Sequence, residues 1–385
     1  MAVTVGAPTH RSMRRSFTGL LGMIVLLLGA IAGAGMLTVY LLRQGVPQPI
    51  LPPVAANPAP YTVLYTQGGH IWAAEQNGQR HELIIHLDTL GGQVNRIDLA
   101  PDGRMLAITA GGGTEQGWLL SAPGIAAQPL LPPPSALAPG PLTFLDTVWP
   151  GPHSVTVLVQ TTDGKSVRPL IGSYTHIDTA VTLHGHWSRP HGNGRAISLS
   201  PNGQQVLEAL AYSGKGSFAG QTVIRLQHLD RRQESIALRY LGSHFPEAAR
   251  WSPDGGTVAI WSPDIGLAIQ KSSGRPVELV QDGGTPLAFS ALSADLAYVS
   301  GKPGAWMIHV LELHGEKDQA FSAPAGAPQW LGWTPDARAL LYVGSGKIGS
   351  DVWQIEPGSG QAVRILTGIT GQVLGIGRTG TSVKP

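Results

Sequence analysis

The stretch Trp251-Ser-Pro-Asp-Gly255, followed by the apolar residues Val258 and Ile260, is the clearest copy of a frame that recurs in this chain of 385 residues. Proline presets φ for the first position of a tight turn, aspartate caps the turn with its own side chain, and glycine accepts the left-handed conformation. The frame therefore predicts a strand, a turn and a second strand. Three further copies have an apolar residue at the same offset after the turn: Leu99-Ala-Pro-Asp-Gly103, Leu199-Ser-Pro-Asn-Gly203 and Trp333-Thr-Pro-Asp-Ala337.

Two weaker copies, Val148-Trp-Pro-Gly-Pro152 and Phe289-Ser-Ala-Leu-Ser293, complete a series of six. The third residues of the six copies are 101, 150, 201, 253, 291 and 335, so successive copies are 38 to 52 residues apart. A period of roughly 40–50 residues with alternating apolar positions is typical of the four-stranded blades of a β-propeller, and it excludes a helical solenoid.

The two ends of the repeat region complement each other. Residues 61–65, 71–72 and 82–85 predict three strands of a blade that lacks its first strand, and residues 372–376 predict a lone first strand. Pairing of this last strand with the first three closes the ring and removes open sheet edges.

We therefore predict an all-β fold, a seven-bladed β-propeller over residues 61–380, followed by a short tail, 381–385. Six blades are the fallback if the weak copy near Val148 is not a blade. Four tryptophans stand at matched positions in the third strands and are predicted to pack as wedges between blades: Trp72, Trp118, Trp306 and Trp353.

The N-terminal region predicts a membrane anchor. Residues 17–42 carry no charge and would form a helix of about 39 Å, longer than a hydrocarbon core of roughly 30 Å. Three arginines precede this segment and Arg43 alone follows it, so the positive-inside rule places residues 1–16 in the cytoplasm and the propeller outside the cell. The alternatives are a cleavable signal peptide and a twin-arginine export signal around Arg14 and Arg15.

Two features around the predicted helix concern its partners. Gly29 and Gly33 would let two such helices approach closely and form a homodimer, although small residues are common in any spanning helix. Residues 43–60 are rich in proline and predict a semi-rigid linker that holds the propeller away from the membrane.

Composition excludes several classes of protein. Four of the 26 basic residues lie within residues 1–43, which leaves 22 basic against 24 acidic residues in the remainder. A nearly neutral domain without a run of basic and aromatic residues argues against binding to nucleic acid. The chain has no cysteine, which excludes a disulfide framework and a lipoprotein anchor.

The Trp-Ser-Pro-Asp-Gly frame, together with Asp351-Val-Trp-Gln-Ile355 and Ala362-Val-Arg-Ile-Leu-Thr367, resembles the WD40-like (PD40) repeats of the TolB-type propellers. The resemblance covers residues 61–380. It implies a β-propeller and says little about function. The propellers of prolyl-oligopeptidase-like enzymes are similar as well.

Lysines and histidines supply the candidate binding residues. Four of the seven lysines follow a glycine in the predicted hairpin after the second strand of a blade, which places them on one rim: Lys165, Lys215, Lys302 and Lys347. Lysine and glycine suit exposed hairpins in general; the functional interpretation is a rim that attracts anions. His184, His186 and His191 form the densest histidine cluster and should lie on the same rim. We interpret the cluster as a polar connection between blades; the alternative is that it holds one metal ion.

No catalytic residue or cofactor site is predicted. The fingerprints Gly344-Ser-Gly-Lys-Ile-Gly349 and Gly375-Ile-Gly-Arg-Thr-Gly380 do not lead into a helix, as dinucleotide binding requires. We therefore predict a membrane-anchored, extracytoplasmic module without enzyme activity, which binds an envelope protein or an anionic polymer. The alternatives are a propeller lyase or hydrolase acting on sugars or lactones in the central funnel, and a dimerising sensory ectodomain.

Overall fold

The computed structural model describes residues 61–378, apart from short internal segments at 68–69, 77, 84–92, 101–104, 121–126, 152, 163–166, 176, 178–182, 184, 191–194, 212–220, 230–234, 272–277, 281, 293–294, 314–316 and 325. The predicted cytoplasmic tail, membrane helix, Gly29 and Gly33, proline-rich linker and C-terminal tail lie outside the described residues. Within the described part, no helix is long and apolar enough to cross a membrane.

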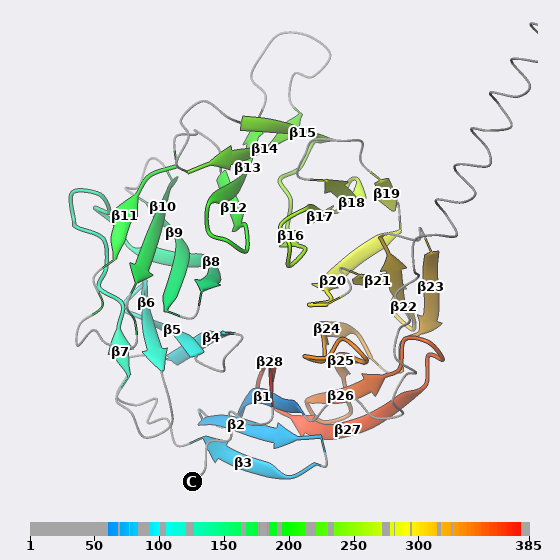
Figure 1. Ribbon diagram of the computed structural model, residues 1–385. Coiled ribbons are helices and arrows are strands. Elements are labelled where there is room, and N and C mark those ends of the chain that lie inside the picture. Colours follow the sequence, from blue (N-terminus) through cyan, green and yellow to red (C-terminus); the bar gives the residue numbers. More distant parts are fainter. Residues whose placement is uncertain are drawn as a thin grey trace, which may run out of the picture. The chain divides into compact units, whose positions relative to one another are not determined.

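Seven four-stranded antiparallel sheets are arranged as blades around a central axis (Figure 1). From the axis outward, blade 1 consists of β28 (Val373–Arg378), β1 (Tyr61–Gln67), β2 (His70–Glu75) and β3 (Arg80–Leu83). Blades 2 and 3 consist of β4 (Gln93–Leu99), β5 (Met105–Gly111), β6 (Thr114–Leu120) and β7 (Gln128–Pro129), and of β8 (Leu142–Gly151), β9 (Ser154–Thr162), β10 (Val167–Thr175) and β11 (His186–Ser188).

Blades 4 to 7 repeat this order. Blade 4 consists of β12 (Arg195–Leu199), β13 (Gln205–Ala211), β14 (Thr222–His228) and β15 (Ser235–Gly242), and blade 5 of β16 (Ala248–Trp251), β17 (Thr257–Ser262), β18 (Gly266–Lys271) and β19 (Glu278–Val280). Blade 6 consists of β20 (Gly283–Phe289), β21 (Leu296–Lys302), β22 (Ala305–Glu312) and β23 (Lys317–Ser322), and blade 7 of β24 (Pro328–Trp333), β25 (Leu340–Ser345), β26 (Ser350–Ile355) and β27 (Ala362–Ile369). The prediction of seven blades is confirmed, because the weak copy near Val148 forms β8 and β9.

The recurring frame forms the same turn between the first and second strands of several blades. Its hydroxyl residue is fully buried: Ser252 and Thr334 are 0% exposed. The Thr334 hydroxyl donates to Asp336 Oδ1 over 2.7 Å and accepts from the Ala339 backbone N–H over 3.0 Å. Ser200 repeats both bonds, with Asn202 and Gln205. The turn therefore satisfies its own buried polar groups, as a turn at the end of an inner strand must.

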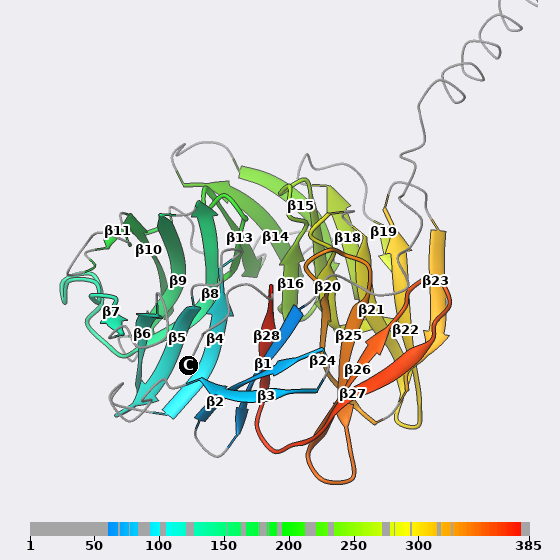
Figure 2. The ribbon, with the colours of Figure 1, turned by 60° about the horizontal axis from the view of Figure 1, so that its bottom comes forward.

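The ring closes by pairing between the two ends of the chain. β28 lies antiparallel to β1, with Tyr61 opposite Arg378 and Val63 opposite Ile376, and Figure 2 shows the two strands side by side in red and blue. The Thr66 N–H donates to Gln372 O over 2.8 Å, which continues the pairing beyond the strand. The predicted closure by both termini is confirmed.

The four matched tryptophans lie on third strands, as predicted. Trp72 packs against a cluster that joins blades 1 and 7, Trp118 against one that joins blades 1 and 2, and Trp306 and Trp353 against one that joins blades 6 and 7. All four are half-buried. The largest fully buried side chains include second-strand tyrosines, among them Tyr65, Tyr298 and Tyr342.

Gly371 allows a direct test of the closure. A Cβ atom at this position would lie 1.8 Å from the Thr66 backbone oxygen, so any side chain must push β28 away from β1. We predict that Gly371→Ala lowers the free energy of unfolding by about 2 kcal/mol or more, measured by urea unfolding. Gly358→Ala is the control, because nothing lies within 4 Å of a Cβ there. Equal stability of the two variants would contradict closure by this pairing.

The frame turn allows a second test, in which two substitutions should change the free energy of unfolding in opposite directions. Ala337 has φ of 58° in the position where Gly255 has φ of 70°. A left-handed conformation costs a residue with a Cβ roughly 1–2 kcal/mol, and the greater freedom of glycine in the unfolded chain offsets part of this. Ala337→Gly should therefore raise the free energy of unfolding by up to about 1 kcal/mol, and Gly255→Ala should lower it by about 1 kcal/mol. The same sign for both changes would be inconsistent with this account.

Candidate binding channel

The inner strands of blades 5, 6 and 7 line a cavity of about 850 Å³ near the axis, and residues of β4 and β28 complete its wall. Ligand pockets typically have volumes of roughly 300–1,000 Å³. The lining is rich in aromatic side chains: Trp251, Trp261, Phe289, Trp330 and Trp333. The cavity therefore offers a large apolar surface to a ligand.

Hydrogen bonds to the inner strand of blade 6 hold two of these indoles. Trp261 Nε1 of blade 5 donates to Gly283 O over 2.9 Å, and Trp333 Nε1 of blade 7 donates to Ala288 O over 3.1 Å. Each bond satisfies a carbonyl of β20. The ring of Trp330 lies against Gly332, where an added Cβ would be 2.2 Å from the indole. The aromatic wall is thus fixed by contacts between neighbouring blades.

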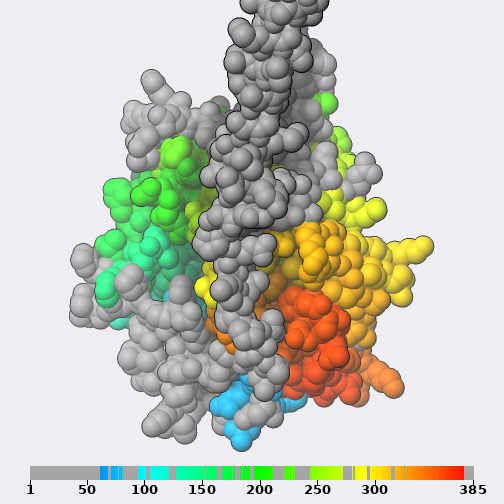
Figure 3. Space-filling model, turned by 45° about the vertical axis from the view of Figure 1, so that its right-hand side comes forward, coloured from blue at the N-terminus to red at the C-terminus, as the bar shows by residue number. Residues whose placement is uncertain are grey.

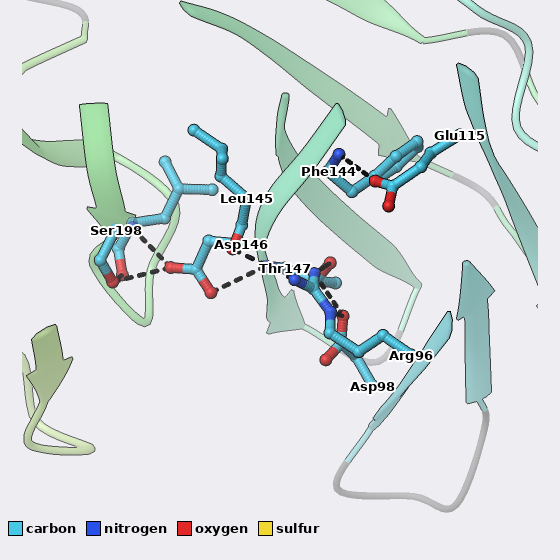
Figure 4. A network of polar contacts seen from close by, with 9 residues as sticks. Arg96, Asp98, Glu115, Phe144, Leu145, Asp146, Thr147 and Ser198 are labelled. Atoms are coloured by element: carbon cyan, nitrogen blue, oxygen red, sulfur yellow. Dashed lines mark hydrogen bonds and ion pairs between the residues drawn. The ribbon is translucent and has the colours of Figure 1, made fainter. Parts of the chain in front are cut away.

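The opposite arc of inner strands is polar (Figure 4). The carboxylate of Asp146 on β8 accepts hydrogen bonds from Ser198 Oγ and Leu199 N, both over 2.7 Å, and from Thr147 N over 2.9 Å. Burial raises the pKa of Asp146, and these hydrogen bonds, with the charge of Arg250, oppose the rise. Both oxygens of the Asp146 carboxylate thus accept hydrogen bonds from the protein. Asp146 therefore connects blades 3 and 4, and this bonding argues against a role in binding substrate.

Blade 2 caps the inner edge of β8 in the same way. Arg96 pairs with Asp98 over 2.9 Å and donates to Leu145 O over 3.2 Å. Glu115 Oε2 accepts from Phe144 N over 2.6 Å. An inner strand has no fifth strand beside it, so its open backbone groups need such partners. We interpret these charged residues as connections between blades.

Arg250 on β16 differs from them. It is exposed and lines the cavity, and its guanidinium donates to the backbone oxygen of the preceding residue, Ala249. A guanidinium has five donor hydrogens, and within the described residues this is the hydrogen bond found for it, so donors remain for a ligand. Glu247 is the other charged residue of the lining, and Gln329 adds an amide. The cavity therefore combines an aromatic wall with one cation and one carboxylate.

The residues predicted from sequence lie elsewhere. Lys302 and Lys347 are exposed and occupy the hairpins β21–β22 and β25–β26, which are equivalent in adjacent blades. His186 is exposed on β11. Lys165, Lys215, His184 and His191 lie outside the described residues, and within the described part no group of three or more His, Cys, Asp or Glu side chains could hold a metal ion.

Sequence reasoning missed the channel residues, although a signal for them exists. In each blade with this frame, the residues directly before Ser-Pro-Asp or Thr-Pro-Asp belong to the innermost strand. The position of the frame in the sequence could therefore have placed four residues near the axis: Arg250, Trp251, Trp330 and Trp333.

Neither a protein-family model nor a curated protein matches the sequence. Solved structures share the fold. The β-propeller domain of the Trilobed protease from Pyrococcus furiosus, described as having an open velcro topology, is 10% identical at a TM-score of 0.53, over 80% of this chain and 93% of that one. A puromycin-hydrolyzing peptidase of Mycobacterium tuberculosis is 14% identical (TM-score 0.52, 80% of this chain and 53% of that one). A putative 6-phosphogluconolactonase of Bacteroides fragilis is 12% identical (TM-score 0.51, 83% and 97%).

These identities show the fold alone. TolB from Acinetobacter baumannii is also among the similar structures, at 14% identity and a TM-score of 0.44 over 82% of this chain and 81% of that one. The comparisons therefore support the propeller part of the resemblance.

One prediction needs correction. From the sequence we predicted that the protein is not an enzyme. This prediction is wrong, because this fold does not exclude enzyme activity. A peptidase and a putative lactonase have the same fold, so the fold gives no ground for excluding catalysis. At 12–14% identity, these similarities establish no activity for this chain either.

The raised pKa of Asp146 can be tested by measuring the stability of the protein as a function of pH. This pKa is raised in the native state, so the native state binds this proton more tightly than the unfolded chain, where aspartate has a pKa of about 3.9. The contribution of Asp146 to the free energy of unfolding should thus be greatest below that pH and should fall as pH rises through the raised native pKa. Asp146→Asn should lack this decline, measured by urea unfolding of both proteins between pH 4 and 7. A constant difference between them across this range would show that the pKa is not raised.

Proposed function

We propose that this protein is a binding module that holds an extended, largely apolar peptide segment of a partner protein in its central channel. The observation that carries the proposal is the lining of the cavity by five large aromatic side chains beside an accessible guanidinium. Burial of apolar side chains against such a wall drives association, and convergent polar groups fix orientation.

The polar groups of the lining fit a peptide. Arg250 offers donors to a backbone carbonyl or a carboxylate, Glu247 offers acceptors to a backbone N–H or an ammonium, and the Gln329 amide offers both. A purely anionic ligand would be repelled by Glu247, and a purely apolar one would leave the polar groups without partners. A peptide satisfies both requirements.

The remaining parts of the proposal rest on the sequence. Residues 17–42 would anchor the chain in the cell membrane as a single helix, with the N-terminus in the cytoplasm and the propeller outside, and residues 43–60 would keep the channel away from the lipid surface. The partner would then be another protein of the cell envelope. Lys302 and Lys347 would attract acidic stretches of such a partner to the rim, with an effect that falls as salt increases.

The experiment is photo-crosslinking in intact cells. A photoreactive benzoylphenylalanine replaces Trp330 in the channel or, as the matched control, Val363, which is 62% exposed on the outer strand β27. We expect the channel position to crosslink to one defined peptide of a partner, identified by mass spectrometry, and the outer position not to capture it.

Substitutions at a second channel residue complete the test. With the crosslinker at Trp330, Arg250→Ala should reduce the yield by about tenfold, as loss of a charged hydrogen bond predicts. Arg364→Ala, on the outer strand β27, removes an arginine side chain outside the channel and should leave the yield unchanged. A crosslinking pattern that is the same at both positions, or is insensitive to Arg250→Ala, would overturn the proposal.

A further inference from the structure

A second group of polar residues lies on blade 6, outside the central cavity. Figure 3 views the side of the molecule that carries this blade, in yellow to orange. Residues of β21, β22 and β23 pair in rows: Ser300, Met307 and Ser322 form one row, and Tyr298, His309 and Ala320 form the next. Directly paired residues project from the same face of a sheet, so all these side chains share one face.

A continuous chain of hydrogen bonds runs diagonally across this face. Ser300 Oγ lies 2.8 Å from His309 Nε2, and His309 Nδ1 lies 3.0 Å from Asp318 Oδ2. The serine thus contacts one imidazole nitrogen and the carboxylate contacts the other. With Nδ1–H donating to Asp318, Nε2 is left as the acceptor for the serine hydroxyl. This order of contacts is that of a nucleophile, its general base and the group that orients the base.

The imidazole is held in place from two further directions. The ring of Tyr298 stacks on His309 at 4.6 Å between centroids and 10° between planes. The Tyr298 hydroxyl donates to Asp318 Oδ2 over 3.1 Å, which fixes the carboxylate. Tyr298 itself is buried, at 1% exposure, in the core between blades 5 and 6. A base that is restrained in this way is preorganised for proton transfer.

The group is accessible from solvent. Ser300 is half-buried, and the side chains of His309 and Asp318 are 16% and 41% exposed. Lys302, the last residue of β21, lies two residues beyond Ser300 and is exposed. A positive charge close to the serine would favour an oxyanion that develops there.

We propose that Ser300, His309 and Asp318 form a hydrolytic site for small carboxylic esters, with Ser300 as the nucleophile. Ser300 Oγ attacks the ester carbonyl carbon while His309 Nε2 takes the hydroxyl proton, and Asp318 stabilises the imidazolium. The bond to the alcohol oxygen breaks as Nε2 returns the proton to the leaving alkoxide. Water, deprotonated by the same nitrogen, then attacks the acyl-serine. The bond between the acyl carbon and Ser300 Oγ breaks as Nε2 gives this proton to Oγ, which releases the carboxylic acid and restores Ser300. Lys302 stabilises the oxyanion that forms in both steps.

The first experiment needs no substitution. The full chain is incubated with a fluorophosphonate probe at pH 8 and digested, and the labelled peptides are identified by mass spectrometry. We expect one label, on Ser300. The matched comparison within the same molecule is Ser322, which lies in the same row two strands away and donates to Met307 Sδ instead of a histidine. Failure of Ser300 to react in the folded protein, or equal labelling of Ser300 and Ser322, would overturn the proposal.

The second experiment measures hydrolysis of p-nitrophenyl acetate. Ser300→Ala and His309→Ala should each lower kcat/KM by on the order of 10²-fold or more, which is the usual contribution of a positioned base. Ser322→Ala should leave it unchanged, and Lys302→Gln should lower kcat. Thermal unfolding of each variant establishes that it is folded. Hydrolysis that persists in folded Ser300→Ala would show that the hydrogen-bond chain is a structural connection between strands.

Discussion

The pairing of β28 with β1 is the constraint on which the rest of the structure depends. It joins strands that are separated by almost the whole described sequence, and without it blade 1 would begin with the open edge of β1. The junction leaves no room for a side chain at Gly371, where the backbone of Thr66 is in contact. Core clusters join blade 1 to blade 2 on one side and to blade 7 on the other, so this junction connects the two ends of the row of blades.

Closure creates a second constraint at the axis, where seven inner strands each have an unpaired edge. Several of these edges receive hydrogen bonds from side chains of neighbouring blades, of two kinds. Between blades 2, 3 and 4, the partners are Arg96, Glu115 and Asp146. Around blade 6, they are the indoles of Trp261 and Trp333. The same requirement thus produces a polar arc on one side of the axis and an aromatic arc on the other.

This asymmetry makes the channel suitable for a ligand. Charged groups in the polar arc are mostly bound to one another or to backbone groups, so they contribute little to recognition. The aromatic arc lines the cavity, and Arg250 lies in the same lining; in the described part of the chain its guanidinium donates to Ala249 O. Blade 6 carries the separate Ser300, His309 and Asp318 group on its own strands, so the hydrogen bonds of that group depend on the register within one blade.

Sequence alone predicted the frame turn and the closure, because the chemistry of Pro-Asp-Gly turns and the missing first strand at residue 61 are local properties. It favoured seven blades over six, and the structure decided between them, since the weak copy near Val148 forms β8 and β9. It also placed Lys302 and Lys347 in equivalent hairpins. The meeting of Arg250 with the aromatic wall, the burial of Asp146 against Ser198, and the contact of Ser300 with His309 were decided only by the tertiary structure. Each joins residues from different strands or blades, and neither the register between strands nor the distance across a closed ring can be read from the spacing of residues along the chain.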